Sequence, residues 1–188
     1  MALRDLDFEV EKGELRCLIG PNGAGKTTAL DAICGKTRIA AGEIHYDGRK
    51  IHRLPENARA RRGIGRKFQV PSVFRELSVR DNLQAGYCKR PGVFGNLFDE
   101  GCRQADEELD KLAEFVGLEE QLDRPAAELS HGQTQWLEIA MLMALDAQLF
   151  MLDEPTAGMT AGETRKTAEL CIRLKGRHTL VVVEHDMG

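Results

Sequence analysis

Two overlapping strings decide the fold of this chain of 188 residues, Leu15-Arg-Cys-Leu-Ile-Gly20 and Gly20-Pro-Asn-Gly-Ala-Gly-Lys-Thr-Thr28. The first is a short apolar run that is typical of a buried strand, and the second matches the pattern G-x-x-x-x-G-K-S/T. Glycines allow the backbone to fold around phosphate groups, whose charge is stabilised by the N-terminus of the helix expected at residues 27–34. The order of strand, glycine-rich turn and helix therefore predicts a site for a nucleoside triphosphate.

Every residue of the turn is a candidate for binding this nucleotide: Gly20, Pro21, Asn22, Gly23, Ala24, Gly25, Lys26, Thr27 and Thr28. The ammonium group of Lys26 is expected to reach the β- and γ-phosphates, and the hydroxyl group of Thr27 is expected to bind Mg²⁺. The alternative is a glycine-rich turn whose lysine is merely solvated. The strand before the turn and the helix after it favour the phosphate loop.

Further along the chain, apolar runs alternate with helical patterns. Residues 149–152 and 180–183 are continuous apolar runs of the parallel-strand type, and residues 161–174 between them read as a crossover helix. This alternation predicts an α/β fold with a parallel sheet. Because residues 70–130 show helical patterns only, we expect one domain whose nucleotide-binding core comprises residues 1–69 and 131–188, with residues 70–130 as an inserted helical subdomain.

Two adjacent carboxylates, Asp153 and Glu154, follow the apolar run at residues 149–152. Ligands of parallel sheets bind at the carboxyl ends of the strands, which is also where the phosphate loop is expected. Asp153 is therefore a candidate for holding Mg²⁺, and Glu154 for polarising the attacking water as a general base. The alternative is that either carboxylate caps the next helix. His185 follows the run at residues 180–183, where it is either a contact of the γ-phosphate or a structural histidine.

The composition argues against a disordered or a fibrous protein. The net charge is −4, 42% of the residues are hydrophobic and 30% are charged, which is typical of a globular protein. Five cysteines without a C-x-x-C spacing favour a reducing compartment, so we expect a cytoplasmic protein. The basic run Ala58-Arg-Ala-Arg-Arg62, with Arg66 and Lys67 nearby, is interpreted as a solvated helix face, and nucleic acid is not an expected partner.

Five motifs occur in an order that resembles the ATP-binding-cassette (ABC) ATPases: the phosphate loop, Gln69 in Arg66-Lys-Phe-Gln69, Leu129-Ser-His-Gly-Gln133, the Asp153-Glu154 pair, and His185. The resemblance implies the ABC ATPase fold, a P-loop NTPase core with parallel strands and an inserted helical subdomain. It also implies that the chain binds ATP and Mg²⁺ and hydrolyses ATP.

The resemblance assigns roles to the remaining candidates. It implies that Gln69 senses Mg²⁺ and the lytic water, and that Glu154, Gln69 and His185 are catalytic. It implies that Ser130 and Gly132 bind the γ-phosphate on the opposite subunit, with Gln133 beside them. Two nucleotides would then lie between two subunits in a head-to-tail homodimer or heterodimer. Independently of the family, Ser130 and Gln133 have the spacing of a capping box.

Several strings, among them Ser130-His-Gly-Gln-Thr-Gln-Trp136 and Ala157-Gly-Met159, resemble the ATPase subunit of bacterial urea importers, a branch related to the branched-chain amino-acid importers. Urea is therefore the expected solute. The alternatives are an importer of the branched-chain amino-acid type and a soluble ABC ATPase that is not part of a transporter. The implied partners are a second ABC ATPase, transmembrane permease subunits and, indirectly, a periplasmic solute-binding protein, with the chain on the cytoplasmic face of the inner membrane.

The chain departs from the commonest family pattern at two places. His131 replaces the middle glycine of the signature, and Ala157-Gly-Met-Thr160 replaces Ser-Ala-Leu-Asp. By resemblance, Val70-Pro-Ser-Val-Phe-Arg-Glu-Leu77 forms part of the groove for a helix of the membrane subunit, with ordinary interdomain packing as the alternative. The chain is also interpreted as truncated at both ends, without an adenine-stacking aromatic residue. A nucleotide-binding fragment that does not turn over is the remaining alternative.

Overall fold

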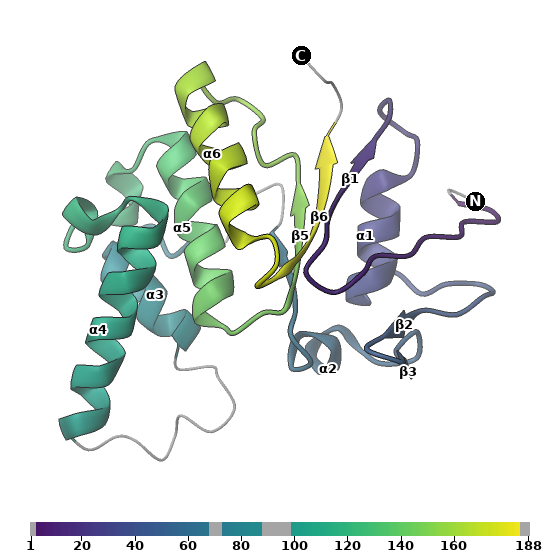
Figure 1. Cartoon of the computed structure of the whole chain (residues 1–188), viewed down its shortest axis with the longest axis horizontal. Helices are drawn as coiled ribbons and strands as arrows, with labels where there is room; N and C mark the ends of the chain where they lie inside the picture. The colour runs from purple at the N-terminus through teal and green to yellow at the C-terminus, as the bar shows by residue number, and fades with distance from the viewer. Residues whose placement is uncertain (1–2, 68–72, 88–98, 185–188) are drawn as a thin grey trace. The chain divides into compact units, whose positions relative to one another are not determined.

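The computed structural model describes residues 3–67, 73–87 and 99–184. The chain divides into two compact units (Figure 1). The first unit comprises Met1–Arg66, Gln148–Pro155 and Leu174–Gly188, and the second comprises Lys67–Ala147 and Thr156–Arg173. None of the described helices combines the length and the apolarity that crossing a membrane requires.

A sheet of four strands forms the centre of the first unit, in the order β1-β6-β5-β4. Its strands are β1 (Leu15–Ile19), β4 (Ile64–Lys67), β5 (Leu149–Asp153) and β6 (Thr179–Glu184). Strand β6 is parallel to both of its neighbours, with Cys17 of β1 and Leu152 of β5 in register with Val182. The predicted parallel sheet is thereby confirmed. The carboxyl ends of β1 and β5 consequently lie at the same edge.

Helix α1 (Lys26–Cys34) packs on the apolar side chains of this unit. Its buried residues Leu30 and Cys34 share a core with Met151 of β5 and with Val181 and Val183 of β6. The short helix α2 (Glu56–Ala60) and the hairpin of β2 (His45–Tyr46) and β3 (Arg49–Lys50) complete the unit. The hairpin turns at Asp47 and Gly48, whose positive φ angles of 49° and 71° are typical of an Asp-Gly hairpin turn.

Helices make up the second unit. They are α3 (Val79–Tyr87), α4 (Asp99–Val116), the 3₁₀ helices η2 (Glu119–Gln121) and η3 (Ala126–Glu128), α5 (His131–Ala144) and α6 (Ala161–Leu174), the last residue of which belongs to the first unit. Helix α5 lies at the centre of their core, and Trp136, Leu137 and Ala140 are buried there. Gly86 allows α3 to approach α5 closely, because a Cβ atom at this position would lie 3.1 Å from Ala144 Cβ.

The grouping of helices differs from the predicted domain bounds. Residues 131–147 and 156–173 belong to the second unit, whereas the sequence assigned residues 131–188 to the nucleotide-binding core. The physical reason is that α5 is apolar on nearly every face and buries these side chains among α3 and α4. As a functional division, the bounds 1–69, 70–130 and 131–188 stay a prediction.

Candidate functional site

The phosphate loop joins the end of β1 to the first turn of α1. Gly23 and Gly25 have φ angles of 81° and 91°, a left-handed conformation that other residues adopt only with strain. The N–H group of Ala24 donates to Pro21 O at 3.2 Å, which closes the turn before the helix begins at Lys26. The predicted succession of strand, turn and helix is thus present at residues 15–34.

The ammonium group of Lys26 and the positive end of a helix dipole both lie at the start of α1. No side chain among the described residues caps this helix end, so its N–H groups and dipole favour an anion. The Nζ atom of Lys26 donates to Gly20 O at 2.5 Å and to Pro21 O at 3.0 Å, which folds the ammonium group over the loop. An ammonium group held by carbonyl oxygens can exchange them for phosphate oxygens. The loop can therefore bind a polyphosphate.

Asp153 is the last residue of β5 and is 1% exposed. Its Oδ2 atom lies 3.4 Å from Nη2 of Arg66 in β4, and Nη1 of Arg66 forms a close ion pair with Asp31 of α1. Burial disfavours the charge of Arg66, but its hydrogen bonds to Cys34 and Asp31 outweigh that effect and raise the pKa of Arg66. One guanidinium group therefore connects α1, β4 and β5.

The second carboxylate oxygen of Asp153 fits a magnesium ligand. Oδ1 is buried and has no hydrogen-bond partner within the described part of the chain, and such orphaned buried oxygens are rare. The hydroxyl group of Thr27, in the first turn of α1, is the other oxygen that the sequence predicts as a magnesium ligand. The described residues contain no group of three or more His, Cys, Asp or Glu side chains that would enclose a metal. Mg²⁺ suits such a site, because it is usually bound by one or two carboxylates together with substrate phosphates.

Glu154 has an unusual backbone. Its φ angle is 49°, in the left-handed region that few non-glycine residues occupy, and its N–H group donates to Val183 O at 2.9 Å. The backbone therefore leaves strand geometry directly after the end of β5 at Asp153. Strained backbone of this kind is concentrated at functional sites.

The segment at the start of α5 forms the predicted capping box. The N–H group of Gln133 donates to Ser130 Oγ at 3.2 Å, and the N–H group of Ser130 donates to Gln133 Oε1 at 2.9 Å. Gly132 is buried in the first turn of the helix. The two departures from the family pattern meet here, because His131 Nε2 donates to Ala157 O at 3.0 Å. This contact was not predicted, since the two residues are far apart in sequence.

Two arginines correct the interpretation of the basic run as a solvated face. Arg59 is 2% exposed and donates to four carbonyl groups, those of Ala32, Ile33, His52 and Leu54. Burial lowers the pKa of Arg59. The side chain of Arg66 is 5% exposed. Arg61 and Arg62 are exposed as predicted.

Two predicted catalytic residues, Gln69 and His185, lie outside the described residues, as does part of the predicted groove at residues 70–77. Within the described end of that segment, the apolar side chains of Phe74 and Leu77 are 50% and 42% exposed.

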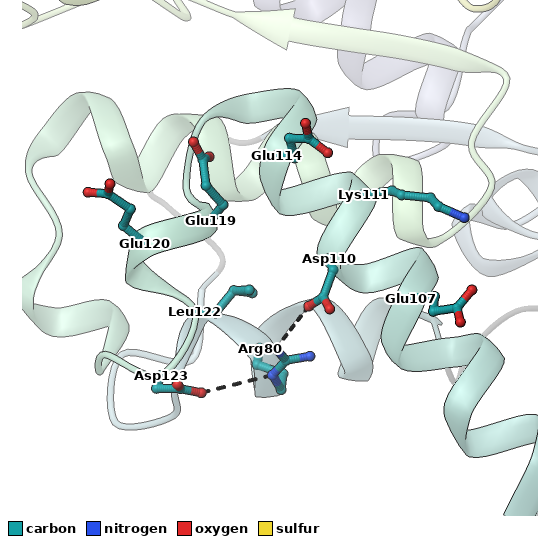
Figure 2. A pocket seen from close by; sticks show the side chains of 9 residues that line it. All are labelled: Arg80, Glu107, Asp110, Lys111, Glu114, Glu119, Glu120, Leu122 and Asp123. Carbon is teal, nitrogen blue, oxygen red and sulfur yellow. Dashed lines mark hydrogen bonds and ion pairs between the residues drawn. The ribbon is translucent and has the colours of Figure 1, made fainter.

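A hollow of about 690 Å³ lies elsewhere, on the second unit (Figure 2). It is lined mainly by acidic side chains around Arg80, which donates from Nη2 to Asp110 Oδ1 at 2.9 Å. Arg80 Nε also lies 3.9 Å from Asp123 Oδ1. The ion pairs of Arg80 connect α3 with α4 and with the segment after η2. We therefore interpret the hollow as a charged surface with a structural role. It contains no residue of the phosphate loop and is a poor site for a nucleotide.

The family model described as ABC transporter matches residues 3–157. The chain belongs to the ABC transporter family. As a member of its ATPase class, the chain is an enzyme that binds and hydrolyses ATP. The chain is 36% identical to the high-affinity branched-chain amino acid transport ATP-binding protein LivG of Salmonella typhimurium, over 100% of this chain and 77% of that protein.

Two further comparisons agree with this ABC ATPase assignment. The branched-chain amino acid transport ATP-binding protein BraF of Pseudomonas aeruginosa is 35% identical, over 100% of this chain and 77% of BraF. The crystal structure of the ADP conformation of MJ1267, an ATP-binding cassette of an ABC transporter, has a TM-score of 0.85 and 29% identity. That match covers 100% of this chain and 76% of MJ1267.

Proposed function

We propose that this chain is the ATP-binding and ATP-hydrolysing subunit of an ABC importer. The observation that carries the proposal is the sheet of the first unit, in which β1 leads into the phosphate loop and β5 ends at Asp153. Both strands are parallel to β6, so Lys26 and the two carboxylates are delivered to one edge. The relatives support an importer, since they include ATP-binding proteins named for branched-chain amino acid transport and for phosphate import.

For the solute, we propose a branched-chain amino acid. Urea was the solute expected from the sequence strings. The relatives LivG and BraF, which are 36% and 35% identical to this chain, are both named for branched-chain amino acid transport. The strings that favoured urea lie around Ser130 and Ala157, where the described contacts are internal to the ATPase. Such residues are selected by the nucleotide cycle and carry little information about the solute.

We assign separate roles in nucleotide binding and hydrolysis to residues of the first unit. The loop from Gly20 to Thr28 would enclose the phosphates, and Lys26 would exchange its two carbonyl contacts for β- and γ-phosphate oxygens. Thr27 and Asp153 would hold Mg²⁺, which neutralises charge on the β- and γ-phosphates when it is bound. Glu154 would accept a proton from the water that attacks the γ-phosphorus.

The remaining roles belong to the same proposal. Gln69 would contact Mg²⁺ and the lytic water, and His185 the γ-phosphate. Ser130, Gly132 and Gln133, at the N-terminus of α5, would bind the γ-phosphate held by a second subunit in a head-to-tail pair.

The proposed partners are transmembrane permease subunits on the cytoplasmic face of the membrane. A periplasmic solute-binding protein would act through them and not on this chain. The exposed apolar side chains of Phe74 and Leu77 support a contact with a permease helix at this segment.

Two measurements test the proposal. Uptake of radiolabelled leucine and of radiolabelled urea is compared in cells that carry the chain and in cells that carry Lys26→Ala. We expect leucine uptake to be lost and urea uptake to be unchanged. Loss of urea uptake alone would restore the urea interpretation, and normal uptake of both solutes would contradict the importer.

The second measurement is sedimentation velocity with ATP in the Glu154→Gln background. We expect an ATP-dependent dimer that Ser130→Arg prevents while monomeric ATP binding persists. A normal dimer of the Ser130→Arg variant would contradict the sandwich.

A further inference from the structure

The side chain of Glu163 connects the N-termini of two helices in the second unit. Its Oε2 atom accepts from the N–H and hydroxyl groups of Thr160, at 3.0 and 2.9 Å, where α6 begins. Its Oε1 atom accepts from Ser130 Oγ at 2.8 Å, where α5 begins. One carboxylate therefore accepts hydrogen bonds at the starts of two helices. Ser130 and Glu163 are 33 positions apart in sequence.

The carboxylate lies directly over the first turn of α5. A Cβ atom added at Gly132 would lie 2.5 Å from Glu163 Oε1. The backbone of Gly132 is the smallest of the contributions that lower the pKa of Glu163. Ser130 and Gly132 are the two residues that the proposed function assigns to the γ-phosphate of the opposite subunit. A negatively charged group of this chain thus already accepts the hydroxyl proton of Ser130 and lies against Gly132.

The carboxyl group of Glu163 is ionised in this position. Hydrogen bonds from the Thr160 backbone, and from the Ser130 and Thr160 hydroxyl groups, lower its pKa to about 2, so it is ionised at neutral pH. Lys166, which lies three residues after Glu163 on the same helix, is directed elsewhere, with Nζ 3.9 Å from the centre of the Trp136 ring and 3.4 Å from Gly117 O. The carboxylate is consequently held by neutral donors, and its negative charge is not neutralised by that lysine.

We propose that Glu163 is an internal anion that competes with the γ-phosphate for Ser130 and Gly132, and so raises the ATP concentration at which two subunits close. A serine hydroxyl group has one proton to donate, so Ser130 cannot serve both acceptors at once. The phosphate must either displace Glu163 or approach it as a like charge. This inference rests on the proposed function, because it takes the sandwich of two subunits as its reference.

The test replaces the carboxylate by its neutral isostere. In the Glu154→Gln background, the dimer is followed by sedimentation velocity as ATP is increased, with and without Glu163→Gln. Glu169→Gln is the matched control, since Glu169 is an exposed glutamate of the same helix. We expect Glu163→Gln to lower the midpoint ATP concentration by about tenfold, as removal of a like charge near the phosphate requires, and the control to leave it unchanged.

The outcomes separate the two proposals. ATP binding by the monomer is measured in parallel by calorimetry. An unchanged or higher midpoint for Glu163→Gln, in a chain that does dimerise, overturns the inference and leaves the proposed function standing. A chain that binds ATP but forms no dimer in any variant overturns the sandwich and the inference with it.

A second variant serves if Glu163→Gln does not fold. Glu163→Asp keeps the charge and the position in the cap of α6 but shortens the reach toward Ser130. Its midpoint is expected to lie below that of the parent, and a midpoint equal to that of the parent would overturn the inference.

Discussion

Arg66 offers the sharpest test of the first unit, because its single positive charge lies between two carboxylates. The Arg66→Met substitution retains an apolar stem of similar length and removes the guanidinium group. Asp153, whose side chain is 0% exposed, then loses its ion pair inside the unit. Asp31 is less affected, because it is 20% exposed and lies 3.9 Å from Lys36 Nζ.

The magnitude follows from this burial. Removal of one partner from a buried ion pair costs about 3–5 kcal/mol, because the other charge is left uncompensated. That is a large share of the roughly 5–15 kcal/mol by which a domain is stable. With a denaturant slope near 2 kcal/mol per molar urea, the unfolding midpoint should fall by about 1.5–2.5 M.

Urea unfolding followed by circular dichroism measures this change. The double variant Arg66→Met with Asp153→Asn is the control, since it removes the charge that was left alone. We expect the double variant to be more stable than Arg66→Met by more than about 1 kcal/mol, which is a coupling typical of residues in contact. A loss below about 1 kcal/mol in Arg66→Met, or a double variant that is no more stable than Arg66→Met, would refute the reasoning.

Two other substitutions are predicted from the same unit. Arg59→Met leaves the carbonyl groups of Ala32 and Ile33 at the end of α1 without their donor and should lower the free energy of unfolding by about 3–5 kcal/mol, whereas Arg61→Met should change it by less than about 0.5 kcal/mol. Equal effects of the two in thermal melts would contradict the role of Arg59. Glu154→Gln should retain ATP binding and slow phosphate release at least about 100-fold in a steady-state assay, and near-normal turnover would remove Glu154 from the role of base.

The sequence predicted the parallel core well, because that core is encoded by local patterns. The apolar runs at residues 149–152 and 180–183 became β5 and β6, and the helix expected at residues 161–174 is α6 with the same bounds. The start of α5 could be predicted only from the capping-box spacing, because the apolar pattern of this helix begins later, near Trp136. Gly117 has a φ of 71° at the end of α4, as expected of a glycine C-cap.

Contacts between segments that are distant in the chain could not be predicted from the sequence. Arg59 and Arg66 were interpreted as solvated because a basic run gives no sign of the carbonyl and carboxylate groups that will surround it. Arg59 reaches Ala32, 27 positions earlier, and Arg66 reaches Asp153, 87 positions later. The contact of Glu163 with Ser130 was missed for the same reason. Thr160 and Glu163 have capping-box spacing, which could have identified the start of α6 but not the second helix that shares the carboxylate.

The most direct test of the account is a calorimetric titration of the chain with Mg-ATP, with Lys26→Ala as the matched variant. The account predicts saturable binding with one nucleotide per chain, and loss of tight binding in Lys26→Ala at unchanged thermal stability without ligand. Equal affinity of the two proteins would contradict it, because ATP would then be bound without the phosphate loop.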